Sequence, residues 1–309
     1  MGLLFVFLIS IASLLPISVE APYVYFAPIT PLQQRKEANI LFAGDMMFDR
    51  SIRIATEKEG DGFVLSCVKD VLRQADLVVA NLEGPITSHP SMSATSVLGT
   101  PENITFTFPT TTAELLARHN MGLVNIGNNH IMNFGSEGLA QTKEWLSKAG
   151  VNFFGDPETD NVAKVTVGGI PFSFVSWSDW TGGTQEKILD KIRAEAAQGQ
   201  IVVVYTHWGE EYVEPPASVR ELAHAFVEAG AEIIIGSHPH VIQESELYNG
   251  KQIYYSLGNF VFDQYWDEEV RTGLLLQIAF NEGGVESIDE IKTRLERDRR
   301  TCLKEQEIE

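Results

Sequence analysis

Acidic and histidine side chains follow short apolar runs at several places in the sequence. Asp45 comes after the run 40–43, and Glu83 comes after the run 77–80. Four of the seven histidines stand in equivalent places, namely His130, His207, His238 and His240. Carboxylates and imidazoles together are ligands that suit zinc, manganese or iron. The pattern therefore predicts a site for one or two divalent metal ions, whose identity the sequence leaves open.

Two of these histidines are separated by a single residue. Alternate side chains of an extended segment point the same way, so His238 and His240 can address one ion or two ions side by side. A carboxylate that bridges two ions would hold them about 3.5–4 Å apart, as in two-metal enzymes. The other three histidines, His89, His119 and His224, lack this context, and we interpret them as ordinary polar residues.

The charge of the chain limits the partners it can have. The 309 residues include 23 basic and 42 acidic side chains, which gives a formal net charge of −19. A surface this acidic repels phosphate backbones, so we expect no nucleic-acid partner. An anionic substrate needs local positive charge, which divalent cations beside Asp45 and Glu83 would provide. The hydrophobic fraction of 44% is enough for a large core and argues against a disordered chain.

The elements that position these residues alternate along the chain, which predicts an α/β fold. Several apolar runs are continuous Val, Ile and Leu, as in strands buried on both faces. The predicted strands are Asn39–Ala43, Leu77–Ala80, Leu123–Ile126, Val151–Phe154, Phe172–Trp177, Ile201–Tyr205, Glu232–Ile235, Gln252–Tyr255 and Gly273–Ala279. The predicted helices are Phe63–Gln74, Thr112–His119, Glu137–Ala149, Gln185–Ala197 and Ala217–Ala229. In such sheets ligands bind beyond the carboxyl ends of the strands, where Gly44, Gly127 and Gly236 are expected to permit sharp turns.

The remaining segments flank a folded domain at 38–283. Residues 1–21 contain the apolar stretch Gly2–Val19 and predict a signal peptide or an N-terminal membrane anchor, hence an exported, extracytoplasmic protein; a buried strand or helix of a soluble protein is the alternative. We predict that residues 22–37 form a linker. We predict that residues 284–309 form a charged tail with a solvated helix. Cys67 and Cys302 are too far apart in sequence for a metal knuckle, and two cysteines make no disulfide framework.

Six segments in order resemble the CapA family of capsule (poly-γ-glutamate) synthesis proteins, which is related to calcineurin-like metallophosphoesterases. They are GDMMFDR, NLEGPIT, NNHIMNFGSEGL, THWGEEY, GSHPHVIQ and YSLGNFVFDQ, between residues 38 and 275. The resemblance implies a four-layer α/β/β/α sandwich with mixed sheets and a dinuclear metal centre. It implies metal ligation by Asp45, by a bridging Glu83, and by Asn129, His207, His238 and His240. His130 would be the acid that protonates the leaving group.

The chain departs from these patterns at two points. The Asp-x-His of many phosphoesterases is absent, because Gly44-Asp45-Met46-Met47 offers no histidine, so a single or weakly held ion is an alternative. Asn133 stands where an Asp commonly follows the Asn-Asn-His motif, and an amide orients His130 less strongly than a carboxylate. Both departures weaken the expectation of catalysis.

Further side chains receive roles around the predicted centre. Arg50, and with it Arg53, would neutralise charge that develops on the substrate; the alternative is a surface cation in each case. Trp208 and Tyr212 would be substrate walls or core aromatics. Glu210 and Glu211 would accept a hydrogen bond from the His207 ring. Asn259 would contact the substrate or a ligand. The segment 87–109 is expected to form a long loop over the site.

Three functions follow as alternatives. The first is a metal-dependent hydrolase or transferase that acts on an anionic cell-envelope polymer such as poly-γ-glutamate. The second is a general metallophosphoesterase that acts on phosphoesters. The third is a non-catalytic, membrane-anchored scaffold that works with other membrane-bound subunits of a capsule synthesis and export complex. The apolar N-terminal segment favours the first and third functions. The missing Asp-x-His and Asn133 favour the third over the second.

Overall fold

The computed structural model describes residues 36–159, 162–181 and 183–304, which lie in one compact unit, Arg35–Glu309. The predicted export segment, 1–21, and nearly all of the linker lie outside the described residues. Among the helices within those three ranges, none is both long and apolar enough to cross a bilayer.

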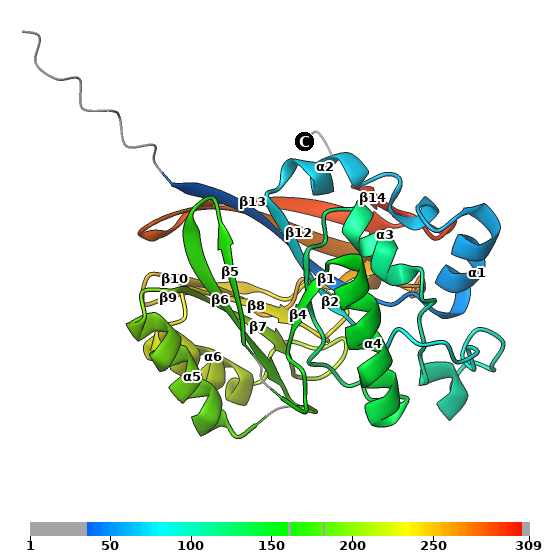
Figure 1. The fold of residues 1–309 in the computed structure, drawn as a ribbon, viewed down its shortest axis with the longest axis horizontal. Helices are drawn as coiled ribbons and strands as arrows, with labels where there is room; N and C mark the ends of the chain where they lie inside the picture. Colours follow the sequence, from blue (N-terminus) through cyan, green and yellow to red (C-terminus); the bar gives the residue numbers. More distant parts are fainter. Residues whose placement is uncertain (1–35, 160–161, 182, 305–309) are drawn as a thin grey trace, which may run out of the picture. The chain divides into compact units, whose positions relative to one another are not determined.

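The described chain alternates strands and helices (Figure 1). The strands are β1 (Glu37–Met46), β2 (Leu77–Leu82), β3 (Leu123–Asn125), β4 (Asn152–Phe154), β5 (Val162–Val167), β6 (Ile170–Ser178), β7 (Ile201–His207), β8 (Ile233–Ser237), β9 (Ser245–Tyr248), β10 (Lys251–Tyr254), β11 (Asn259–Val261), β12 (Thr272–Asn281), β13 (Gly284–Leu295) and β14 (Thr301–Leu303). The helices are α1 (Arg50–Glu59), α2 (Lys69–Gln74), α3 (Thr112–Arg118), α4 (Gly135–Ala149), α5 (Gln185–Ala197), α6 (Ala217–Ala229) and α7 (Glu268–Arg271), with 3₁₀ turns η1 (Phe63–Leu65) and η2 (Pro101–Ile104).

Two mixed sheets form the framework. The first has the order β14-β13-β12-β1-β2-β3-β4, and β11 pairs in parallel with the end of β1. The second has the order β5-β6-β7-β8-β10-β9. The central strands of each sheet, β1 to β4 and β6 to β8, run parallel, so their carboxyl ends meet at one edge of their sheet.

Three apolar clusters separate the layers. One lies between the two sheets and contains Ile40 and Phe42 from β1 together with Phe174 from β6. Leu41, the residue between them, belongs to a second cluster that packs the first sheet against α1 to α4. The third cluster packs the second sheet against α5 and α6, which Figure 1 shows on the far side of that sheet. This confirms the four-layer α/β/β/α sandwich, and burial on both faces explains the continuous apolar runs.

The C-terminal prediction was wrong. A solvated helix is predicted within 284–309, but residues 284–295, which include Ile288, Ile291 and Leu295, form β13, which pairs antiparallel with β12 along its length. The exposed edge of β12 offers a ladder of backbone partners, and this outweighs the weak helical spacing. The predicted helix Phe63–Gln74 is also interrupted, because it divides into η1 and α2.

The interruption between η1 and α2 contains a disulfide. Cys67 bonds to Cys302 in β14 across a sequence separation of 235 residues. The expectation that the two cysteines form no framework missed this bond, because only the folded sheet brings β14 beside η1. The disulfide therefore fixes the last described strand to the helical layer.

Candidate metal centre

Side chains from both sheets meet at the carboxyl ends of their parallel strands. Asp45 lies near the end of β1, and Glu83 follows β2 directly. Asn129 and His130 follow β3, and His207 is the last residue of β7. His238 and His240 follow β8, which neighbours β7. Two sheets are thus needed to assemble this one group of residues.

Three overlapping sets of side chains could each hold a cation. The sets are Glu83 with His207 and His238, Asp45 with Glu83 and His240, and Glu211 with His238 and His240. Within each set the ligand atoms lie within 4.8 Å of one another. Glu83, His238 and His240 each belong to two sets, so the geometry has room for two neighbouring ions that share Glu83. Glu211 is an addition, since it was expected only as a partner of His207.

The carboxylate of Glu83 has no hydrogen-bond partner. Both of its oxygens are buried, and so is the unpartnered Nδ1 atom of His238. A buried polar atom without a partner costs about 1–3 kcal/mol, and more when it is charged. Burial and the proximity of Asp45 raise the pKa of Glu83 well above its usual range. A divalent cation would satisfy these atoms and keep the carboxylate charged, so the residues present fit a metal ion.

Asp45 is also buried but is partly satisfied. Burial raises its pKa to about 7, against the stabilising effect of the His238 backbone N–H and the Asn81 amide. The N–H donates to Oδ2 at 3.0 Å, and the Asn81 amide donates to Oδ1 at 2.7 Å. Asn81, at the end of β2, was not predicted; it occupies the same place after an apolar run as Asp45, which was the available signal.

The three histidines of the centre are held in the form that binds metal. Burial lowers the pKa of His238 to about 4 and that of His240 to about 3. It lowers the pKa of His207 well below the usual value, and the neighbouring imidazoles add to this effect. Neutral imidazole is the ligand form, so none of the three must lose a proton at neutral pH to bind an ion.

Asn259 sets the orientation of His240. Its side-chain nitrogen donates to the Oε1 atom of Gln264 at 2.9 Å and to the carbonyl of Val270 at 3.1 Å. Its Oδ1 therefore accepts, and it accepts from His240 Nδ1 at 2.9 Å. The lone pair of His240 is then on Nε2, which lies 3.7 Å from Glu83 Oε1. A neighbour that fixes the tautomer in this way is typical of metal-bound imidazoles.

His130 is held in the opposite tautomer. The Asn133 amide donates to His130 Nδ1 at 3.2 Å and to the carbonyl of Ile104 at 3.0 Å. The ring proton of neutral His130 is therefore on Nε2, which lies 4.0 Å from Glu83 Oε1. Burial lowers the pKa of His130 to about 4, so in the free protein the ring is neutral and offers a single N–H to a group at the centre.

Backbone strain is concentrated around these residues. Seven described non-glycine residues have positive φ, and His238 (98°), His240 (58°), Arg50 (48°) and Tyr212 (61°) are four of them. Such conformations cost about 1–3 kcal/mol each and typically occur at functional sites. The glycines act differently from the prediction. Gly44 and Gly236 are not in turns but in strands, where an added Cβ would lie 1.9 Å from a backbone oxygen.

A pocket of about 450 Å³ opens over the centre. His130, His240 and Glu211 line it on the metal side, and the loop residues 93–104 contribute much of its wall, as expected for a loop over the site. Arg50 also lines it, but its guanidinium is paired with Asp263 at 2.5 Å and lies against the rings of Phe106 and Phe262. Tyr212 stands at its edge beside Trp266, with ring centroids 5.7 Å apart.

Three of the side chains do not line the pocket over the centre. Trp208 is fully buried, donates to the Tyr255 carbonyl and packs in the third apolar cluster, which confirms the alternative of a core aromatic. Arg53 does not line the pocket; it pairs with Asp49 at 2.9 Å and donates to the Thr107 carbonyl. Glu210 is exposed, and the His207 ring instead contacts Ser237, Asn81 and Asn129.

Two residues near the centre were overlooked. The ring of Trp180 lies 4.3 Å from that of His238 and is 47% exposed. It follows β6, so inspection of the residues after that strand would have identified it. Asp49 is fully buried and accepts from Ser91, from the Thr107 backbone and from Arg53. It holds both ends of the loop that covers the pocket.

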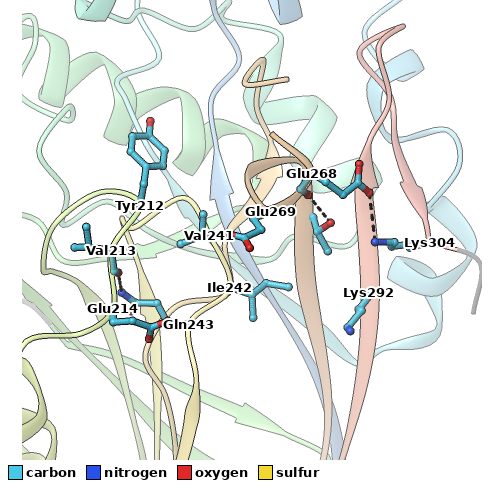
Figure 2. A pocket seen from close by; sticks show the side chains of 11 residues that line it. Tyr212, Val213, Glu214, Val241, Ile242, Gln243, Glu268, Glu269, Lys292 and Lys304 are labelled. Carbon is cyan, nitrogen blue, oxygen red and sulfur yellow. Dashed lines mark hydrogen bonds and ion pairs between the residues drawn. The ribbon is translucent and has the colours of Figure 1, made fainter. Parts of the chain in front are cut away.

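A second cavity of about 640 Å³ shares Tyr212 with the pocket over the centre. Figure 2 shows charged side chains along it, including Glu268, which pairs with Lys304 at 3.3 Å. None of the residues that line it belongs to the three sets that could hold a cation. The pocket over the centre is therefore the one that bears on its chemistry.

Comparison with known proteins gives a consistent result. The family described as bacterial capsule synthesis protein PGA_cap matches residues 39–264. The PGA biosynthesis protein CapA of Bacillus subtilis is 30% identical over 79% of this chain and 68% of its own length. The capsule biosynthesis protein CapA of Bacillus anthracis is 28% identical over 87% of this chain and 70% of its own length. A probable polyglutamine synthesis accessory protein of Mycobacterium tuberculosis is 30% identical over 45% of this chain and 44% of its own length.

Proposed function

We propose that this chain, which belongs to the PGA_cap family of bacterial capsule synthesis proteins, is a metal-dependent hydrolase or transferase that acts on an anionic cell-envelope polymer. The observation that carries the proposal is the buried Glu83 carboxylate, whose two oxygens have no partner and lie among neutral imidazoles. The names of the Bacillus relatives refer to PGA and capsule biosynthesis, which supports a polymer of the cell envelope as the substrate.

The residues of the centre have distinct parts in this proposal. Glu83, His238 and His240 would hold the cation or cations, with Asp45, Asn129, His207 and Glu211 completing the set. When bound, a divalent cation supplies Lewis acidity and lowers the pKa of water to about 7. His130 would direct its Nε2 proton at the oxygen that carries charge in the substrate, because Asn133 occupies its other nitrogen.

Local charge explains how an acidic protein could bind an anion. Asp45, Glu83 and Glu211 together supply three negative charges, against four positive charges from two divalent ions. The Arg50 guanidinium lines the same pocket, but Asp263 neutralises most of its field. Attraction of the substrate would therefore depend on the metal, and chelation would remove it.

The scaffold role remains a second candidate, and one observation favours it. Burial keeps His130 neutral and Asn133 supplies no negative charge to offset it, so the imidazole is a weak proton donor to a leaving group. A chain that retains the metal centre but transfers no proton would bind the polymer without cleaving it.

An exported location is part of both candidates. The Cys67–Cys302 disulfide supports it, because disulfides persist in oxidising compartments and are rare in the cytosol. The apolar segment Gly2–Val19 would then serve as the signal or the anchor.

Metal analysis and an activity assay test the proposal. The purified chain should retain one or two divalent ions and should hydrolyse poly-γ-glutamate or a simple phosphoester when Mn²⁺ or Zn²⁺ is added. Chelation and the His238→Ala substitution should both abolish this activity. A His238→Ala protein that binds as much metal as the parent would refute the centre. Metal binding without any hydrolysis would favour the scaffold.

A further inference from the structure

We propose that the substrate group bound over the metal centre carries an apolar segment, so that the pocket recognises an amphipathic anion rather than a uniformly polar one. This inference rests on the proposed function and specifies the substrate class of the same site. Its basis is the distribution of exposed apolar side chains, which gather around this pocket.

The rim of the pocket is unusually apolar. Leu98, Trp266, Ile104, Ile54 and Tyr212 line it with exposed fractions of 85%, 63%, 55%, 52% and 41%. These are five of the eleven large apolar side chains that are exposed in the described parts of the chain. Single exposed apolar residues are common, but a contiguous group of them marks a binding surface. We refer to these five residues as the apolar rim.

The apolar rim is continuous with the metal centre. Phe106 and Phe262 line the same pocket as the apolar rim. The Phe106 ring lies 4.4 Å from that of His130, and the Phe262 ring lies 4.8 Å from that of His240. A ligand whose anionic end reaches the centre would therefore pass the Arg50 guanidinium, which lies over these two buried rings, and then extend along the rim.

The loop 87–109, which carries part of the apolar rim, is held in place by hydrogen bonds. Asp49 anchors the loop 87–109 through Ser91 and Thr107. Within the loop, the Asn103 amide donates to Ser96 at 3.0 Å. The fold thus holds Leu98 and Ile104 over the pocket with their side chains exposed. A substrate with an apolar part would bury these side chains and offset the unfavourable free energy of their exposure.

The second cavity provides an internal contrast. It lies beyond Tyr212 and is lined by Val213, Val241 and Ile242 together with three glutamates and two lysines, but none of its residues belongs to a set that could hold a cation (Figure 2). The combination of a cation site, aromatic rings and an apolar rim occurs at the first pocket, so an amphipathic anion fits there. A lipid surface would also cover exposed apolar side chains, but the rim lines a concave pocket that ends at the metal ligands.

A series of phosphonates tests the inference on the intact chain loaded with Mn²⁺. Methylphosphonate, butylphosphonate and hexylphosphonate share one anionic head and differ only in apolar length. We expect the affinity, measured by calorimetry, to rise about fourfold for every two methylenes, which is about half the gain for full burial. Leu98→Ser and Trp266→Ala should flatten this series, so that hexylphosphonate binds little better than methylphosphonate. Leu247→Ser, at a 70% exposed position outside both cavities, is the matched control and should have no effect.

Each other outcome has a defined meaning. If methylphosphonate binds but longer chains bind no better, the inference fails and the proposed function stands. If none of the three binds the Mn²⁺-loaded chain, the anion site itself is refuted, and the inference fails with it. If Leu98→Ser abolishes binding to phosphatidylglycerol vesicles and leaves the phosphonate series unchanged, the apolar rim is a membrane contact and the inference is overturned.

Discussion

Asn133 donates a hydrogen bond to Nδ1 of His130 over 3.2 Å and thereby places the ring proton on the nitrogen that faces Glu83. A carboxylate at this position would do the reverse, because it accepts a hydrogen bond from Nδ1–H and stabilises the charged ring. This single contact bears on whether the centre is a strong catalyst or a binding site.

The Asn133→Asp substitution should convert His130 into a better acid. We expect its pKa to rise from about 4 toward neutrality, because an adjacent opposite charge favours the imidazolium. Any hydrolytic rate with a poor leaving group should then increase by about tenfold or more near pH 6–7. The pH–rate profile measures this, and Asn120→Asp, at a partly buried asparagine distant from the centre, controls for the added charge. An unchanged profile would exclude His130 from proton transfer.

Glu83→Gln should separate metal binding from folding. Loss of an outer partner of a metal ligand typically costs about 10–100-fold in affinity, so loss of a shared ligand should cost more than about 100-fold. The metal-free variant should melt at or above the temperature of the metal-free parent, because it no longer buries an unpartnered carboxylate. Elemental analysis and thermal melts test both effects, with exposed Glu210→Gln as the control. A metal-free variant that unfolds early would indicate a structural role instead.

Metal affinity should depend on pH through Asp45. The pKa of this acid is raised from 3.8 to about 7 in the metal-free fold, so the folded state holds a proton that the unfolded state has released. Between these two values its contribution to the stability of the metal-free protein falls as the pH rises. A bound cation removes the proton and the penalty, so Mn²⁺ should raise the melting temperature more at pH 8 than at pH 6. The histidines do not reverse this, because His238 and His240 are neutral above about pH 5. An equal increase at both pH values would contradict the assignment of Asp45.

Asp49→Asn should loosen the loop over the pocket. The substitution removes the charge that pairs with Arg53 and one of the acceptors that hold Ser91 and Thr107, which should cost about 1–3 kcal/mol of unfolding free energy. Limited proteolysis should cut within 87–109 sooner than in the parent. Asp61→Asn, at an exposed pair with Arg118, should change stability by less than about 1 kcal/mol. Equal losses in the two variants would deny Asp49 its anchoring role.

The Cys67→Ser substitution should lower stability by about 2–4 kcal/mol, because the bond restricts the unfolded chain over a separation of 235 residues. Denaturant unfolding measures the loss. The parent treated with dithiothreitol should behave like the variant, whereas dithiothreitol should not affect the variant. A reductant effect on both proteins would show that the loss does not come from this bond.

The sequence was sufficient for the elements that repeat a simple pattern. The buried strand β7 was predicted from its continuous apolar run, and the helix α6 from apolar residues spaced three to four apart. Helix α6 also ends at a glycine in the left-handed conformation, Gly230. One rule, that parallel strands end at a common edge, brings Asp45 close to Glu83 in the first sheet and His207 close to His238 and His240 in the second. The meeting of the two edges at one centre does not follow from that rule.

What the sequence could not supply was the partner of each side chain. Trp208 and Trp180 are both aromatic residues after strands, yet Trp208 is buried in the core and Trp180 lies exposed beside His238. Arg50 and Arg53 lie on the same helix, yet only Arg50 lines the pocket. β13 formed a strand because β12 was available to pair with it. Such contacts depend on residues far away in sequence, which local patterns do not contain.

The metal ligands are drawn from two sheets that otherwise meet through an apolar layer and a few hydrogen bonds, such as those from Tyr205 to the Ala43 carbonyl and from Ser176 to Asn125. An apolar layer of that kind opposes separation of the two sheets. It restricts sliding of one sheet over the other less, because one apolar neighbour can replace another. A cation coordinated by residues of both sheets would fix the position of one sheet relative to the other. A bound metal ion would then stabilise the packing of the two sheets against each other, also in regions far from the substrate pocket.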